Sequence, residues 1–180
     1  MQDQKSGLSI ENGMYRGALF TDSLNVVYNI RYMPVTVRND SSISLSLHLG
    51  FSKEYSFPSP NEEHQFFLVP LPAEWAKDGK PITDKMQEEL PLAINKPVSV
   101  VRLEPKEEVL FAIGALYERG ETGGLLPKEL FTYKDEILSQ GCDQYQDEKF
   151  VSSSPFKLGI RASYGANCLI IPCGYLSYSD

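Results

Sequence analysis

Alternation of apolar and polar side chains is clearest over residues 43–51. Apolar side chains occupy every odd position of this segment: Ile43, Leu45, Leu47, Leu49 and Phe51. Period-two alternation predicts a β-strand with one buried face. A second alternating segment, 156–164, is followed by Gly165-Ala-Asn167 and then by an apolar segment to Tyr178. This spacing predicts a β-hairpin near the end of the chain.

Residues 24–38 carry the same pattern with a change of parity. The apolar side chains are first at even positions, up to Tyr32, and then at the odd positions Val35 and Val37 after Met33-Pro34. Such a change indicates that the buried face has switched, which happens at a bulge or where a strand passes from one sheet to another. We therefore predict a crossing between sheets at Pro34, and a crossing favours a sandwich over a closed barrel.

Three further segments complete the predicted elements. Residues 109–117 are apolar on both parities, which predicts a central strand covered on both sides, and Gly114 within it indicates a bulge or a close backbone approach. A helix is predicted within 72–96, capped by Thr83 or Asp84 and shortened or kinked by Pro91. Residues 127–138 are predicted to form a second short helix.

The predicted elements indicate an all-β, mainly antiparallel fold. About eight strands with one or two short helical insertions suit a two-sheet β-sandwich, and the lack of alternating long helices argues against a parallel α/β sheet. Residues 1–7 are polar and predicted to be a disordered tail. Residues 8–180 are then predicted to form one domain, a usual size for a single core.

Charge and hydropathy limit the partners. The net charge is −7, from 17 Lys and Arg against 24 Asp and Glu. An acidic surface repels phosphate backbones and anionic lipids, so we expect no nucleic-acid partner. No apolar run approaches the roughly 20 residues that span a bilayer, so we expect no membrane insertion.

Cysteine use bears on the compartment. Cys142, Cys168 and Cys173 are either three buried thiols, or Cys142 forms a disulfide with Cys168 or with Cys173 in an oxidising compartment. Residues 1–7 contain no apolar core of a signal peptide. We expect a mature secreted, periplasmic or cell-surface chain, or a cytoplasmic chain if Met1 is the native start.

Catalytic chemistry has few candidates. His48 lies on the polar side of its strand, and His64 lies in a polar loop beside Glu62 and Glu63, whose adjacent side chains rarely converge on one ion. Cys142 precedes an acidic residue, which raises a thiol pKa. Motifs for a hydrolase nucleophile, a phosphate loop or a zinc protease are missing. The sequence therefore predicts no catalytic residue and no cofactor, and it favours a protein that is not an enzyme.

Acidic and aromatic residues in the connections are the remaining site candidates. Three acids are candidate metal ligands, although their spacing matches no calcium loop: Asp143, Asp147 and Glu148. Four rings lie in or beside irregular connections: Trp75, Tyr117, Tyr133 and Tyr145. Exposed rings there would stack on sugars or anchor a partner protein, and the alternative is that they pack the insertions onto the sandwich.

Two segments resemble the immunoglobulin-like sandwich modules of bacterial secreted and surface proteins. One is Val35-Thr-Val-Arg-Asn39 followed by Ile43-Ser-Leu-Ser-Leu47, which is similar to a strand, an Asn-containing turn and the next strand. The other is Val101-Arg-Leu-Glu-Pro105 with Glu107, where Lys106 replaces the glycine usual in these modules. The resemblance implies an immunoglobulin-like sandwich with a binding or structural role, and it supplies no site residue.

Three functions remain open at this point. The first is a noncatalytic module that recognises a protein or a glycan, with an oligomeric state that the sequence does not specify. The second is a carboxylate- or metal-dependent hydrolase with its site in the 52–96 and 118–151 loops. The third is a subunit of a larger assembly joined through edge strands.

Overall fold

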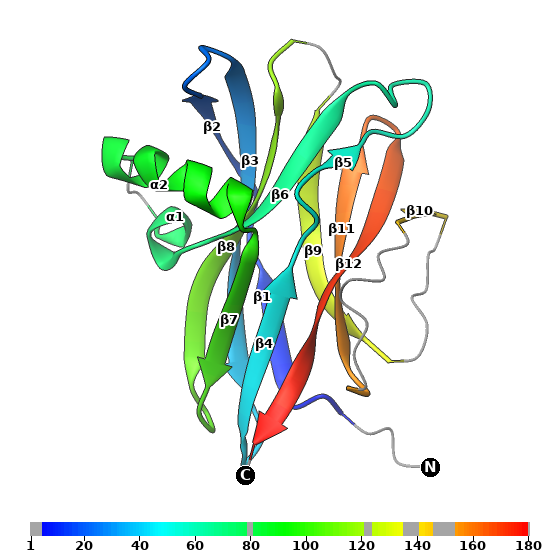
Figure 1. Cartoon of the computed structure of the whole chain (residues 1–180). Helices are drawn as coiled ribbons and strands as arrows, with labels where there is room; N and C mark the ends of the chain where they lie inside the picture. The colour runs from blue at the N-terminus through cyan, green and yellow to red at the C-terminus, as the bar shows by residue number, and fades with distance from the viewer. Residues whose placement is uncertain (1–4, 79–80, 121–123, 135–140, 146–153, 180) are drawn as a thin grey trace.

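The computed structural model describes residues 5–78, 81–120, 124–134, 141–145 and 154–179. Two α-helices and twelve strands lie in these residues (Figure 1). The helices are α1 (Ala73–Ala76) and α2 (Asp84–Asn95). The strands are β1 (Leu8–Asn12), β2 (Arg16–Thr21), β3 (Val27–Asn39), β4 (Ser44–Gly50), β5 (Tyr55–Ser56), β6 (Gln65–Leu71), β7 (Val98–Leu103), β8 (Glu108–Glu118), β9 (Leu125–Tyr133), β10 (Asp143–Gln144), β11 (Lys157–Tyr164) and β12 (Asn167–Ser179).

The strands form two six-stranded sheets, which confirms the predicted all-β sandwich. Sheet A has the order β1-β3-β8-β6-β5, and β2 also pairs with β3. Sheet B has the order β7-β4-β12-β11-β9, and β10 also pairs with β12. The described pairings are antiparallel except for β10 with β12, which is parallel. In Figure 1 the two sheets face each other, and both helices lie outside sheet A.

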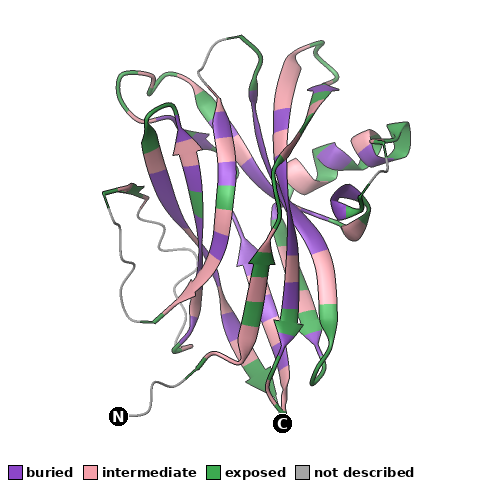
Figure 2. Ribbon diagram, turned by 180° about the vertical axis from the view of Figure 1, so that it is seen from behind, coloured by how far each residue is buried: buried purple, intermediate pink, exposed green. Residues whose placement is uncertain are grey.

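The main core lies between the sheets and is built by period-two alternation. In β4 and just after it the predicted apolar row is buried, with Leu45, Leu47, Leu49 and Phe51 each at most 3% exposed. Strand β11 contributes a row of the same kind that ends at Tyr164. Strands β11 and β12 pair as the predicted hairpin, with Tyr164 opposite Asn167. Buried and less buried bands alternate along several strands in Figure 2.

A second core lies between sheet A and the helices, and it corrects the predicted crossing at Pro34. Strand β3 stays in sheet A, in unbroken register with β8 from Tyr28 to Arg38. Its even residues Ile30 and Tyr32 face the helices, whereas its odd residues from Met33 onward face sheet B. The parity change therefore arises because α1 and α2 cover only one end of the outer face of sheet A.

Strand β8 is buried on both faces for the same reason, as its sequence predicts. Phe111 and Ile113 belong to the main core, and Ala112 and Leu116 belong to the second. At Gly114 a side chain of the neighbouring strand β6 approaches closely, because a Cβ there would lie 2.8 Å from Cδ1 of Leu71. The β8 register shows no bulge, so close packing of a neighbouring side chain explains this glycine.

Helix α2 begins where the sequence predicts. The Thr83 hydroxyl accepts a hydrogen bond from the Met86 amide at 3.2 Å, which caps the first turn. Met86 and Leu90 are buried against sheet A. The helix continues past Pro91 to Asn95, so the proline lies in the last turns without ending the helix.

The helix predicted at 127–138 is wrong over its described part. Residues 125–133 form β9, and residues 135–138 lie outside the described residues. A register shift opposite Arg161 and Ala162 leaves Lys128 as an extra residue in the strand. Because of the bulge, the buried residue after Pro127 is Leu130. This spacing of three is typical of a helix.

Asn39 joins three strands at one end of the sandwich. It is fully buried, and its amide nitrogen donates to the carbonyl oxygens of Ile43 at 2.7 Å and Leu103 at 3.1 Å. Its side-chain oxygen accepts from the amide and the hydroxyl of Ser41. Every polar atom of the side chain thus has a partner, as a buried amide requires.

Lys106 adopts a left-handed backbone conformation that favours glycine. It has φ +68° at the third position of the turn 104–107, where Pro105 precedes it and the Glu107 amide donates to the Glu104 carbonyl. This is the geometry of a type II turn, which favours glycine at that position. The Lys106 amide also donates to the Asn39 carbonyl at 2.8 Å.

We expect Lys106→Gly to raise the free energy of unfolding by about 0.5–1 kcal/mol, because it removes left-handed strain from a side-chain-bearing residue. Loss of the exposed hydrogen bond from Lys106 Nζ to the Asp40 carbonyl offsets part of the gain. Urea unfolding monitored by circular dichroism measures the change. Asn25→Gly is the control, because asparagine tolerates its φ of +62° and the gain should be smaller. A destabilised Lys106→Gly variant would contradict the strain argument.

Candidate functional site

Two of the four candidate binding rings are buried, which corrects their predicted role. Trp75 is 2% exposed and lies in the second core, where its ring meets Tyr32 edge-on with the centroids 5.3 Å apart. Tyr117 is 4% exposed and packs edge-on against Phe57 in the main core. A buried ring has no free face for a sugar, so both residues pack the fold, the alternative that the sequence left open.

Tyr145 and Tyr133 are half-buried. The Tyr145 ring lies edge-on against Tyr55 and Phe66, and its hydroxyl donates to the Ser56 carbonyl. Tyr133 lies on the outer face of sheet B beside Phe131, with the ring centroids 6.1 Å apart. Burial raises the pKa of both phenols, so their hydroxyls stay protonated. Of the four rings, Tyr133 alone lies on an open face of a sheet.

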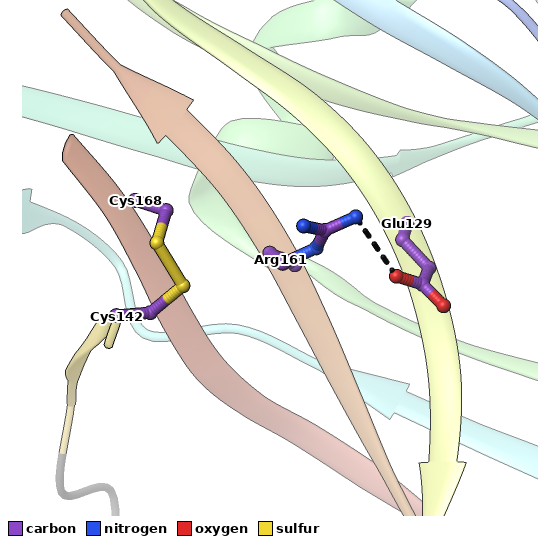
Figure 3. The surroundings of a disulfide bond; sticks show 4 residues. All are labelled: Glu129, Cys142, Arg161 and Cys168. Carbon is purple, nitrogen blue, oxygen red and sulfur yellow. Dashed lines mark ion pairs between the residues drawn. A yellow bond between two sulfur atoms is a disulfide. The ribbon is translucent and has the colours of Figure 1, made fainter. Parts of the chain in front are cut away.

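A disulfide joins Cys142 to Cys168, one of the pairings that the sequence left open. It ties β10 to the start of β12, on the face of sheet B that also carries the ion pair of Arg161 with Glu129 (Figure 3). Cys173 is a buried free thiol, and burial raises its pKa far above the usual range. Cys173 therefore stays a thiol and is not a nucleophile.

Of the three predicted metal ligands, only Asp143 lies within the residues that the structure describes. Asp143 is exposed in β10, and Asp147 and Glu148 lie outside those residues. Nowhere in the described ranges do three His, Cys, Asp or Glu side chains gather as metal ligands would. His48 is half-buried, with its Nε2 2.7 Å from the Ser177 hydroxyl and its ring stacked on Tyr175, and His64 lies 3.4 Å from the Glu63 carboxylate.

A groove along α2 is a concave feature built by several elements of the described chain. Its larger hollow, about 500 Å³, lies between the C-terminal half of α2, the β2–β3 turn and the segment after β4. A second hollow of about 380 Å³ continues it toward the start of α2 and shares with it Phe20, Asp22, Ser23 and Pro91. We call the two hollows together the α2 groove.

Aromatic rings form the floor of the α2 groove. Phe20, Tyr28 and Phe67 come from β2, β3 and β6, and both neighbouring pairs have ring centroids 6.2 Å apart. Leu116 of β8 is buried beneath them, and Ile94 of α2 forms an apolar wall. This floor is the part of the second core that the short helix α2 leaves uncovered.

Acidic side chains form the rim of the α2 groove. Among its lining residues the acids are Asp22, Glu54, Asp84 and Glu88, and Lys53 is the one base. Burial raises the pKa of Tyr28, and the negative charges of Asp22 and Glu118 add to this shift. The Tyr28 hydroxyl therefore stays protonated at neutral pH. The groove offers an apolar floor below a negative rim, which suits a ligand that is both apolar and basic.

The residues of the α2 groove were not singled out from the sequence, although the 52–96 segment, which supplies part of its lining, was one predicted location for a site. The lining side chains come from segments scattered between Phe20 and Leu116. One signal pointed to them. Tyr28 lies at an even position of β3, on the parity opposite to the main core, and thus marks a second apolar face.

The chain matches no protein-family model, and no curated protein matches it significantly. None of the described helices is long and apolar enough to cross a membrane. The two-sheet architecture is compatible with the resemblance to immunoglobulin-like modules.

Proposed function

We propose that this protein is a noncatalytic, immunoglobulin-like binding module that holds an extended, basic and apolar segment of a partner protein in the α2 groove. The observation that carries the proposal is the row of Phe20, Tyr28 and Phe67 along the floor, in which Tyr28 and Phe67 are only half-buried beside α2. A groove bounded by one helix and one sheet face accepts an extended segment whose apolar side chains reach the floor.

Charge favours a basic partner over an acidic one. The rim carries four carboxylates against one lysine, and the whole chain has a net charge of −7. Arginine or lysine next to the apolar anchor would meet opposite charge on entering the groove.

Exposed leucines beside the groove add apolar surface for the same partner. One lies on each side of the groove, next to a lining residue. Leu24 follows Ser23 and is 80% exposed, and Leu92 follows Pro91 and is 74% exposed.

The observations favour a protein partner over a glycan. Glycan binding calls for exposed rings with a free face. On the open face of sheet B, Tyr133 is half-buried, and Tyr175 stacks one face of its ring on His48 with the ring centroids 4.4 Å apart. The disulfide supports a place outside the cytoplasm, because such bonds persist in oxidising compartments.

The test uses three matched probes and two variants. The probes are a capped peptide with alternating leucine and arginine, the same peptide with glutamate for arginine, and a set of neutral oligosaccharides. We expect the basic peptide alone to bind, with shifts in NMR resonances of residues lining the α2 groove. Its affinity should fall as salt rises. Glu88→Lys should weaken binding by about three- to tenfold, because it reverses a rim charge.

Glu89→Lys is the matched control. Glu89 is the next residue of α2, is also exposed, and lines a different hollow. This variant makes the same change of net charge outside the groove and should bind almost as the parent does. Equal losses of peptide affinity in the two variants would show that the net charge of the protein, not the rim of the groove, determines binding. Binding of an oligosaccharide in preference to the peptides would overturn the proposal in favour of glycan recognition.

A further inference from the structure

The edge of sheet B at β7 carries one exposed charge, Arg102, and lacks the other features that usually protect an edge strand. Within the described residues β7 pairs with β4 alone, over six consecutive residues and without a register shift. Residues 98–103 contain no proline, glycine or lysine, and Val98 and Val100 point outward at 47% and 63% exposure. Natural proteins usually blunt such an edge, because its unpaired backbone groups invite another strand.

The other edges in the described part of the molecule are blunted. Strand β9, at the opposite edge of sheet B, has a bulge at Lys128 and a proline at 127. The Asn12 side chain also satisfies backbone groups of β9: it donates to the Leu130 carbonyl at 3.2 Å and accepts from the Leu130 amide at 2.9 Å. In sheet A one edge is formed by the two residues of β5 and then by β6, which contains Pro70, and the edge formed by β1 and β2 is interrupted at 13–15. The open edge at β7 is therefore a specific feature of this sheet.

We propose that β7 pairs antiparallel with β7 of a second copy of this chain, across a two-fold axis at Val100. Residues directly opposite each other in antiparallel strands point to the same face, so outward residues must meet outward residues. This condition restricts the two-fold axis to the position of a residue, and the residues near the middle of β7 are Ser99, Val100 and Val101.

Charge selects one of these three registers. With the axis at Val100, Val100 meets its own copy, Val98 meets the partner's Arg102, and Lys96 lies opposite the partner's Glu104, once on each side of the axis. An axis at Ser99 would place Lys96 opposite the partner's Arg102. An axis at Val101 would place Lys96 opposite the partner's Lys106. Only the register centred on Val100 pairs opposite charges, and both Lys96 and Glu104 are exposed.

The resulting dimer joins two copies of sheet B into one continuous sheet. A single pair of six-residue strands, about 20 Å long, gives an interface at the small end of the range for specific contacts. We therefore expect a weak dimer, visible in sedimentation equilibrium as a mass that rises with concentration. This surface is separate from the α2 groove, because none of residues 98–103 lines either hollow.

The experiment follows dimerisation in a set of surface variants. Val100→Lys should weaken the dimer at least about tenfold, because it places two positive charges on the axis. Leu92→Lys, at the 74% exposed position on α2, is the control and should dimerise as the parent does. Lys96→Glu and Glu104→Lys should each weaken the dimer, and the double variant should restore it because the charges are exchanged. Circular dichroism checks that each variant is folded.

Cysteine cross-linking reports the register directly. Val100→Cys should form a disulfide-linked dimer under mild oxidation, because the two Cβ atoms on the axis lie within reach of a disulfide. Val98→Cys, also exposed on β7, should cross-link far less, since the partner's Arg102 lies opposite. A chain that stays monomeric at the highest soluble concentration would overturn the proposal. So would a dimer that Val100→Lys leaves intact, or one that cross-links equally through both cysteines.

Discussion

Gly174→Ala should lower the free energy of unfolding by about 3 kcal/mol or more, the largest effect that we expect from a single methyl group in this protein. Gly174 has φ +143°, a conformation that residues with a side chain rarely adopt. A Cβ built at this position would overlap the carbonyl group of His48. Because His48 is held in β4, the two strands would have to separate to make room.

The position of Gly174 explains why the loss would spread through sheet B. Strand β12 is central in this sheet, and Gly174 pairs with Leu49 of β4 on one side and with Leu158 of β11 on the other. A register shift with β11 at this point makes Cys173 an extra residue in β12. Before the bulge the inward residues of β12 have odd numbers, up to Cys173, and after it Leu176 points inward. The glycine therefore lies where the strand changes parity.

Urea unfolding followed by circular dichroism measures the effect of Gly174→Ala. Gly165→Ala is the matched control, because Gly165 also has a positive φ, +55°, but no atoms beyond the two adjacent residues lie within 4 Å of a Cβ built there. We expect the control to cost about 1 kcal/mol, the strain of the left-handed conformation alone. Equal losses in the two variants would show that backbone strain, not the approach of β4, determines the effect.

Trp75→Ala should lower the free energy of unfolding by about 3–5 kcal/mol, because it removes the largest side chain of the second core. Trp75 packs between sheet A and the helices and is 2% exposed. It is also the one tryptophan of the chain, so its fluorescence in the parent protein reports this core alone. Coincidence of the fluorescence transition with the circular dichroism transition would show that the helices unfold together with the sandwich.

The matched variant is Trp75→Phe, which keeps an aromatic ring facing Tyr32 and should cost clearly less than alanine. Binding of the basic peptide serves as the second readout. If Trp75→Ala left stability nearly unchanged and abolished peptide binding, the indole would belong to the ligand site instead of the core. That outcome would restore the role that the sequence alone predicted for Trp75.

The sequence predicts a strand well when the cover on each of its faces is the same along the whole strand. The row Leu45, Leu47 and Leu49 in β4 and the doubly apolar β8 were both predictable, because burial alone determines their patterns. Strand β3 was harder to interpret. Its even residues pack under helices and its odd residues pack against sheet B, so a change of cover along one strand resembled a change of sheet.

Local irregularity explains most of the remaining errors. A single extra residue, Lys128, shifts the burial of β9 from a spacing of two to a spacing of three, which is typical of a helix. The α2 groove was not predictable either. Phe20, Tyr28 and Phe67 lie on β2, β3 and β6, which come together only when the sheet forms in the order β2-β3-β8-β6. Their sequence positions carry no common motif, so the sheet order is needed to bring them together.

The bond between Cys142 and Cys168 also determines how the molecule transmits mechanical force. Strand β11 lies inside the covalent ring of this 26-residue span. Tension applied to the two ends of the chain passes through the sulfur atoms and bypasses β11. In a pulling experiment the oxidised chain would extend less than the reduced chain by about 85 Å, the extended length of the 26-residue span less the 4.8 Å between the two Cα atoms.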